Sequence, residues 1–454
     1  MPKDWAAICK GTPSRSRGSW IISTKAFPSG SAAPGRQGLC FCDRCEADFI
    51  PYLKGTLSPT DLADHGILDI ETLDYSDVVN AWVAAAPGRK FNEHPLWRHW
   101  TIYHANHTVE FMAELKAHAA NIAGHPVPFG ANAGLLWPNH LADYQVLDLF
   151  SSENEHHANL RRFSDLPVLA YRLADAVDRP YAATAAGKDW AFVKAHDLTE
   201  IVRGWIALAY ASGQLFMAPQ RQWCHTDFLG THWYDGPREA YAPLYRFIRA
   251  NAALFDDYQN APLAQLLLPY RAYTEDSERW FEISAELAAA NIPYRVLLAG
   301  DEIVRHPLDP ALLNSGLPIL APHLDGLLPA DRARFDSRSE DVAVHHSVDT
   351  LAAALTPTVR FESPFRIRVL PRIKPGSAVV HLLNYEYQAR SDSVSKIPSL
   401  TLQLDLAALG VPTARHCRVY SPGEESQSLP IEDGRVTLSN LSAWTIVRID
   451  HPKT

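Results

Sequence analysis

The stretch Val146-Leu-Asp-Leu-Phe-Ser-Ser-Glu153 is a mostly apolar run that ends on a carboxylate. Further short apolar runs, which we predict to be buried strands, occupy residues 127–132, 168–171, 180–184 and 214–218. An amphipathic helical pattern covers residues 198–212 and ends at Gly213. Buried strands that alternate with helices are typical of parallel β/α units covered on both faces. The sequence therefore predicts an α/β fold that begins with a (partial) TIM (β/α) barrel, because only four or five such units fit between residues 91 and 257.

Polar and aromatic side chains follow the ends of the predicted strands. They are Asn132, Glu153, Tyr171, Gln220 and Trp223. In a barrel this edge is the catalytic rim. We expect Asn132, Tyr171 and Gln220 to contact substrate hydroxyls and Trp223 to stack on a sugar ring. The alternatives are a Trp223 that fills core and polar groups that satisfy local backbone.

Carboxylates on that rim are the candidates for acid/base chemistry. Glycoside hydrolysis needs two carboxyl groups, about 5 Å apart for retention and about 6.5–9.5 Å for inversion. Glu153 is the leading candidate, and Asp175 and Asp227 are candidates for its partner. Glu155 is a lesser candidate. The alternative is that Glu153 is a solvated residue that caps the next helix.

Helical periodicity is strongest at residues 95–122. The apolar stripe includes Leu96, Trp100, Leu115 and Ile122, and Gly124 follows as the expected stop. A shorter helix is expected at 46–54.

Two further sections follow this region. Residues 262–320 read as a smaller α/β unit, with a helix near 280–290. From about residue 365 the pattern becomes β-rich, as in a small β-sandwich, with strands at 378–384, 400–404 and 445–449. We predict three domains, at 1–260, 261–362 and 363–454.

The composition of the chain argues against some classes of function. The chain has 454 residues, 42 Lys+Arg and 51 Asp+Glu, and therefore a net charge of −9, which argues against a nucleic-acid partner. No run of eighteen apolar residues suggests a membrane-spanning helix, and no secretory signal is seen, so a cytoplasmic location is expected. The 12 Trp, 17 Tyr and 17 Phe are compatible with a carbohydrate-binding enzyme.

Three cysteines crowd into six positions, as Cys40-Phe-Cys42-Asp-Arg-Cys45. Thiolates this close suit a tetrahedral metal better than a strained disulfide. Zinc needs four ligands, and Cys9 is the other cysteine upstream. The alternative is a reduced thiol cluster on a loop.

The stretch Cys40-Phe-Cys-Asp-Arg-Cys-Glu-Ala-Asp-Phe-Ile-Pro-Tyr-Leu53 resembles the zinc-binding loop of glycoside hydrolase family 42 β-galactosidases. The order of segments is also similar to that family: a barrel, a flavodoxin-like trimerisation-type α/β domain and a small β domain. The resemblance implies structural Zn²⁺ on Cys40, Cys42, Cys45 and Cys9, and a homo-oligomer, dimer or trimer.

The sequence also departs from the family. Neither the acid/base Glu before the cysteine loop, at residues 26–39, nor the nucleophile Glu on the penultimate strand, at 180–186, has a counterpart. This indicates a divergent relative, an N-terminally truncated fragment or a non-catalytic descendant. We expect a glycoside hydrolase that acts on an oligo- or polysaccharide, with no organic cofactor. The alternative is a catalytically inactive carbohydrate-binding or assembly protein that keeps the fold.

Overall fold

The computed structural model describes residues 41–135, 138–226 and 230–451. The chain divides into two compact units, Met1–Phe129 and Gly130–Thr454. This boundary differs from those expected at residues 260 and 362, and the division into three domains stays a prediction. Over the described residues, no helix is both long and apolar enough to cross a membrane.

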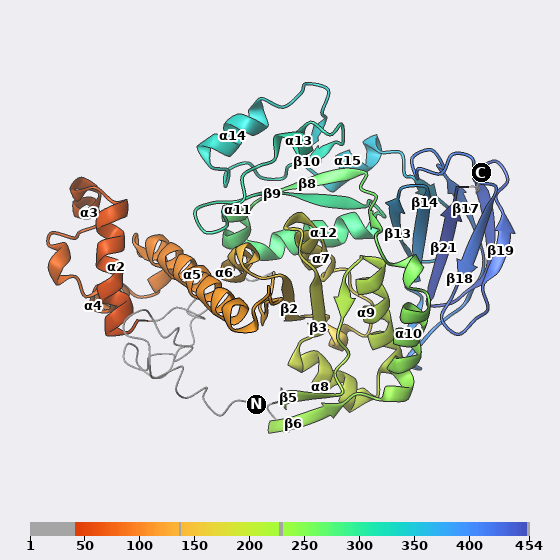
Figure 1. Ribbon diagram of the computed structural model, residues 1–454, viewed down its shortest axis with the longest axis horizontal. Coiled ribbons are helices and arrows are strands. Elements are labelled where there is room, and N and C mark those ends of the chain that lie inside the picture. Colours follow the sequence, from red (N-terminus) through yellow and green to blue (C-terminus); the bar gives the residue numbers. More distant parts are fainter. Residues whose placement is uncertain (1–40, 136–137, 227–229, 452–454) are drawn as a thin grey trace. The chain divides into compact units, whose positions relative to one another are not determined.

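The described part of the first unit is helical (Figure 1). Its elements are α2 (Asp43–Thr56), α3 (Pro59–Asp64), α4 (Tyr75–Ala84) and α5 (Trp97–Ala123), with 3-10 turns at Ile70–Thr72 and Phe91–Glu93. Ser58 and Asp61 form a capping box at the start of α3, and Asp74 caps α4. Gly124 ends α5 with φ 71°, a left-handed conformation that favours glycine. The helices expected at 46–54 and 95–122 are confirmed.

Aromatic rings form the core of this unit. Phe49 meets Trp100 edge-on with ring centroids 4.7 Å apart, and Tyr75 lies 4.9 Å from Trp100. The buried residues of α5 all lie near its start, at Trp100, Ile102, Tyr103 and Ala105. Leu115 and Ile122, expected on the same apolar stripe, are exposed. The stripe therefore contributes to this core through its N-terminal part.

The second unit begins with a parallel sheet whose four strands follow chain order: β1 (Gly130–Asn132), β2 (Leu149–Asn154), β3 (Tyr181–Ala185) and β4 (Leu215–Phe216). The intervening helices are α6 (Pro138–Leu141), α7 (Val168–Ala176), α8 (Gly187–His196) and α9 (Thr199–Ala211), with 3-10 turns at Ala142–Gln145 and Ala158–Leu160. The strands expected around 127–132, 146–153, 180–184 and 214–218 and the helix at 198–212 are confirmed. This is the alternation of strand and helix that the sequence indicates.

The prediction of a strand at residues 168–171 is wrong. Pro167 precedes α7 there, and the seven residues from Val168 to Ala174 are all buried. A short apolar run that is buried on every side has no periodicity that separates a strand from a helix. Tyr171 therefore belongs to a helix and not to a strand end.

After β4 the chain forms an antiparallel hairpin of β5 (Arg221–Thr226) and β6 (Gly230–Asp235), which packs on α8. Helix α10 (Arg238–Ala250) and a 3-10 turn at Ala252–Leu254 follow.

A second parallel sheet has the order β9-β8-β10-β11. Its strands are β8 (Ala264–Pro269), β9 (Tyr294–Ala299), β10 (Ile319–Leu320) and β11 (Val344–His345). The accompanying helices are α11 (Tyr270–Glu275), α12 (Ser277–Ala289), α13 (Pro310–Leu313), α14 (Pro329–Asp336) and α15 (Val348–Ala354). The smaller α/β section expected from residue 262 onward is thus present.

The remaining strands form two antiparallel sheets that enclose one apolar core, a sandwich-like arrangement. The six-stranded sheet has the order β19-β18-β21-β14-β13-β7, and the three-stranded sheet β12-β17-β20. Their strands are β7 (Gln259–Asn260), β12 (Val359–Arg360), β13 (Ile367–Lys374), β14 (Ser377–Asn384), β17 (Ile397–Leu404), β18 (His416–Tyr420), β19 (Gln427–Pro430), β20 (Arg435–Leu441) and β21 (Trp444–Asp450). A small pair, β15 (Tyr387–Gln388) and β16 (Ser393–Val394), lies between β14 and β17 in the chain.

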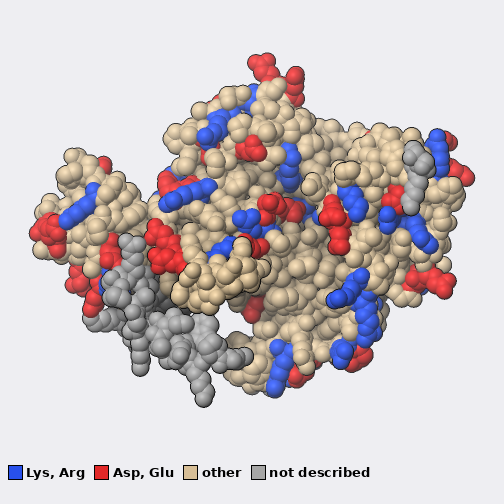
Figure 2. Space-filling view, in the orientation of Figure 1, with Lys and Arg blue, Asp and Glu red and all other residues tan. Residues whose placement is uncertain are grey.

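Lys and Arg side chains are interspersed with Asp and Glu over the face shown in Figure 2. The helices, the parallel sheets and the antiparallel sheets together make the chain a mixed α/β protein with a β-sandwich-like region. The sequence predicts that polar residues gather at the carboxyl edge of the first parallel sheet.

Candidate active site

Glu153 lies at the carboxyl end of β2. Side chains alternate along this strand, so Ser152 and Asn154 are buried whereas Glu153 is exposed. The register pairs Glu153 with Thr184 on β3, and the pairing of β1 with β2 puts Asn132 on the same face. Asn132, Glu153 and Thr184 therefore share one face of the sheet near its carboxyl edge.

The Glu153 carboxylate has a neutral partner. Gln222 on β5 donates from Nε2 to Glu153 Oε1 over 3.4 Å. The neighbouring Thr184 hydroxyl is already used, because its Oγ1 donates to the Met217 carbonyl over 2.8 Å. Glu153 is thus held at the sheet edge by an amide and is open to solvent.

The opposite face of β2 anchors the strand end. Tyr181 donates its hydroxyl proton to Asn154 Oδ1 over 2.7 Å. Ser152 Oγ lies 2.6 Å from the same Tyr181 oxygen and can therefore act as the donor to it. Burial raises the pKa of Tyr181 to about 12, so the phenol keeps its proton at neutral pH. These bonds fix the backbone from which Glu153 projects.

The loop after β2 is held by Asp189 in the first turn of α8. The backbone N–H groups of His156 and Ala158 donate to its two carboxylate oxygens over 2.8 and 2.7 Å. Burial lowers the pKa of His156 to about 4, so its ring is neutral at pH 7, and Nδ1 donates to the Asn154 carbonyl over 3.0 Å. The loop is therefore positioned by buried polar bonds on the side away from solvent.

Glu155 lies in this loop and has charged neighbours. Lys188 Nζ is 2.6 Å from Glu155 Oε1, and His157 Nε2 is 3.9 Å from Oε2. Glu153 and Glu155, two residues apart, are thus placed in different electrostatic surroundings.

The β5–β6 hairpin brings aromatic residues to the same region. Trp223 is 49% exposed, which decides against the alternative that it fills core. Directly opposite it on β6 lies Trp233, which is 43% exposed. Gln220 lies at the base of the hairpin, where its carbonyl accepts a bond from the Gly236 N–H over 3.0 Å.

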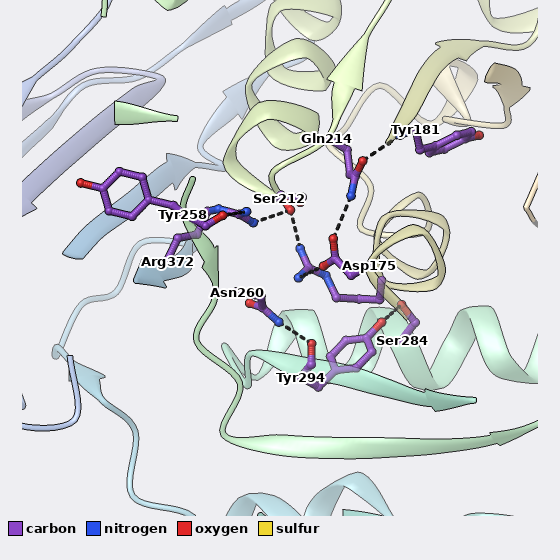
Figure 3. A network of polar contacts seen from close by, with 10 residues as sticks. Asp175, Tyr181, Ser212, Gln214, Tyr258, Asn260, Ser284, Tyr294 and Arg372 are labelled. Carbon is purple, nitrogen blue, oxygen red and sulfur yellow. Dashed lines mark hydrogen bonds and ion pairs between the residues drawn. The ribbon is translucent and has the colours of Figure 1, made fainter. Parts of the chain in front are cut away.

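Asp175 lies at the other edge of the sheet (Figure 3). Its carboxylate pairs with Arg172 at 2.7 Å and accepts from Gln214 Nε2 at 2.8 Å, while Gln214 Oε1 accepts from the N–H of Tyr181, the first residue of β3. Glu153 pairs with Thr184, and the three residue steps from Thr184 back to Tyr181 span roughly 10 Å at about 3.3 Å each, with the Gln214 side chain lying between Tyr181 and Asp175. This exceeds either separation that glycoside hydrolysis uses, so the structure does not bring Asp175 to Glu153.

The other expected site residues are dispersed. Tyr171 is fully buried in α7, so the structure does not place it with the residues at the carboxyl edge. Cys42 precedes α2 and Cys45 lies in its first turn. Cys9, Cys40 and Asp227 lie outside the described residues. Within the described ranges, no group of three or more His, Cys, Asp or Glu side chains is arranged to hold a metal.

A cavity of about 190 Å³ lies away from this region, where α9 and α10 meet the β-rich part of the chain. Glu200 and Arg203 line it and pair with each other at 3.4 Å. None of the expected site residues lines this cavity, so we place the candidate site at the sheet edge, where carboxylates and exposed aromatic rings occur together.

Three residues of this region were not expected from the sequence: Gln222, Lys188 and Trp233. The alternating pattern of 221–226 and 230–235 could have indicated a hairpin with Trp223 and Trp233 on one face. Lys188 meets Glu155 only through the fold of the loop, so no local pattern could have indicated it.

No family model matches the sequence. The α-agarase of Thalassotalea agarivorans is 25% identical over 451 residues, which cover 89% of this chain and 29% of that protein. The α-agarase of Alteromonas agarilytica is 23% identical over 301 residues, covering 61% of this chain and 20% of that protein. The chain therefore spans less than a third of the length of these curated relatives.

Solved structures of β-galactosidases share the fold. The enzyme from Rahnella sp. R3 has a TM-score of 0.56 at 12% identity, covering 90% of this chain and 76% of that one. The enzyme from Bacillus circulans sp. alkalophilus has a TM-score of 0.54 at 10% identity, with 91% and 77% covered. Gan42B, a GH42 β-galactosidase, has a TM-score of 0.51 at 10% identity, covering 91% of this chain and 77% of that one. The resemblance to glycoside hydrolase family 42 is confirmed at the level of the fold.

Proposed function

We propose that this chain is a glycoside hydrolase, or the part of one, that cleaves glycosidic bonds of a galactan such as agarose. One observation carries the proposal: a solvent-open carboxylate, Glu153, lies at the carboxyl edge of a parallel β/α sheet, on the same face as Asn132 and in contact with Gln222 of the β5–β6 hairpin. Catalytic groups of β/α enzymes come from this edge. The two α-agarase relatives support agarose as the substrate.

In this proposal Glu153 is the general acid. A proton donor must reach the oxygen of the leaving sugar, and Glu153 is exposed and bonded to a neutral amide rather than to a cation. Glu155 is the second carboxylate among the described residues, with the charge of Lys188 offsetting its own. When two carboxyl groups lie in different surroundings, one can act as the general acid while the other stays ionised. Asp227 remains a predicted alternative for the second role.

Variants of the two glutamates test the assignment. Wild type, Glu153→Gln and Glu155→Gln are incubated with agaro-oligosaccharides, and products are separated by chromatography. We expect losses of roughly 100-fold or more for each variant. Glu302→Gln, which removes an exposed carboxylate paired with Arg271 in another part of the fold, is the matched control. Turnover that survives Glu153→Gln excludes Glu153, and sugar binding without any turnover by the wild type favours a non-catalytic carbohydrate-binding protein.

The finer fold assignment also belongs to the proposal. The order β9-β8-β10-β11 is second, first, third and fourth along the chain, as in the flavodoxin-like arrangement. We assign a partial TIM barrel, a flavodoxin-like α/β domain and a C-terminal β-sandwich. Self-association as a dimer or trimer is part of this assignment, and light scattering of the purified chain tests it.

A structural zinc ion on Cys9, Cys40, Cys42 and Cys45 is proposed as well. Cys42 and Cys45 lie at the N-terminal end of α2, where the helix dipole favours thiolates. Elemental analysis of the wild type should give one zinc per chain, and Cys45→Ser should reduce it. Wild-type protein without stoichiometric zinc would contradict the assignment.

A further inference from the structure

The outer face of the β5–β6 hairpin carries two tryptophans side by side. The register pairs Trp223 with Trp233 directly across the two strands. Directly paired residues have Cβ atoms about 4.5–5.5 Å apart, so the two indoles project from adjacent positions on one face of the hairpin. They are 49% and 43% exposed. We call this pair the tryptophan platform.

The other face of the hairpin is fixed to the body of the second unit. Tyr234 stacks on Trp190 of α8 with centroids 4.8 Å apart, and its hydroxyl lies 2.7 Å from that of Tyr241 on α10. Lys194 on α8 donates to the Trp233 carbonyl over 2.5 Å. Cys224 is fully buried on the same inner face. The platform therefore stands on a rigid support, which reduces the entropy cost of binding a ligand.

Polar groups and one ion pair border the platform. Arg221 lies over the Trp233 ring at 4.7 Å and pairs with Asp235 at 3.5 Å. His225 stacks with Trp223 at 6.1 Å and an interplanar angle of 18°. Aromatic faces bordered by hydrogen-bonding groups suit the C–H face and the hydroxyls of a sugar ring. The Arg221–Asp235 pair offers no surplus cation to a sulfated chain.

We infer that the tryptophan platform is an accessory subsite that binds a neutral glycan chain on the outer face of the hairpin. Gln222, which contacts Glu153, precedes Trp223 on the same strand, and its side chain lies on the inner face of the hairpin with Cys224 and Tyr234, whereas the platform lies on the outer face. This inference deepens the proposed function and rests on it. It commits to an uncharged galactan rather than to a sulfated one or to a second copy of this chain.

Calorimetric titration on the full chain tests the inference. Glu153→Gln serves as background to prevent turnover, and the probes are agarohexaose and a sulfated carrageenan hexasaccharide. We expect Trp223→Ala and Trp233→Ala each to weaken agarohexaose binding about tenfold, and the Phe variants to restore most of it. The sulfated probe should bind at least about tenfold more weakly than the neutral one.

Trp82→Ala is the matched control, because Trp82 is a partly exposed tryptophan under an arginine, Arg89, in the first unit. It should leave binding unchanged. Unchanged binding in both platform variants, equal affinity for the two probes, or a platform variant that dissociates an oligomer would overturn the inference. Binding that depends on the platform in a wild type without turnover would instead contradict the proposed hydrolysis and leave the platform in place.

Discussion

The buried side chain of His381 makes the free energy of unfolding depend on pH. It is fully buried on β14, and its Nδ1 accepts a hydrogen bond from Trp444 Nε1 over 3.2 Å. An imidazole can accept only while that nitrogen is unprotonated. Burial, with a smaller contribution from Arg372, lowers the pKa of His381 to about 3.

The sign of the effect follows from proton counting. Below about pH 6.5 the unfolded chain binds a proton at this residue and the folded chain does not. Stability from this group is therefore complete above pH 6.5 and is lost as the pH falls toward 3, by about 1.4 kcal/mol per pH unit. We expect His381→Gln, whose amide oxygen can also accept from Trp444, to reduce the slope by about one proton. Urea denaturation at pH 4, 5 and 7 measures it, and an unchanged slope would contradict the assignment.

At the scale of elements, the β5–β6 hairpin requires the backbone at Gly236 to lie close to the backbone at Pro219, at the base of the hairpin. A Cβ on Gly236 would lie 2.2 Å from the Pro219 carbonyl oxygen. This is far inside van der Waals contact, and the obstacle is backbone. Glycine is therefore required there by space rather than by φ.

Gly236→Ala should displace the hairpin. We expect a loss of about 1–3 kcal/mol in the free energy of unfolding and faster proteolysis within 219–236. Gly187→Ala is the control, because its nearest contact, the Trp223 carbonyl at 3.6 Å, is an ordinary one. Limited proteolysis followed by mass spectrometry measures both, and equal cleavage of the two variants would show that the hairpin tolerates a side chain at Gly236.

Helices and strands with a clear pattern in their own sequence could be predicted, whereas contacts between segments far apart in the chain could not. Strand β2 and helix α5 follow from an apolar run and from a 3.6-residue period with a terminal glycine. Helix α7 was missed because its buried run lacks a polar face. Asp175 looked like a rim residue only because α7 was taken for a strand, and its bonds with Arg172 and Gln214 depend on the fold.

At the scale of the whole molecule, a buried ion pair joins the segment between β2 and α7 to the sandwich-like region within the second unit. Arg368 on β13 reaches Asp165 at 2.8 Å, and the Tyr385 hydroxyl donates to the other Asp165 oxygen at 2.7 Å. Asp165 precedes α7, so this cluster connects it to residues 203 and 220 positions further along the chain.

Asp165→Ala should weaken this connection. The variant leaves Arg368 largely buried without its partner, and we expect it to lower the free energy of unfolding by about 3 kcal/mol. Asp336→Ala, which removes an exposed pair with Arg332, should change it by no more than about 0.5 kcal/mol. Calorimetry reports both, and an Asp165→Ala transition that matches the wild type would show that the pair contributes nothing net.

The central claim is that Glu153 donates the proton to the departing sugar, and the leaving group tests it most directly. Turnover by wild type and Glu153→Gln is compared on an agaro-oligosaccharide and on its dinitrophenyl glycoside, whose leaving group needs no proton. We predict a loss of roughly 100-fold or more on the sugar leaving group and less than about tenfold on the dinitrophenyl one. Equal losses on both substrates, or no loss on either, would contradict the role of Glu153.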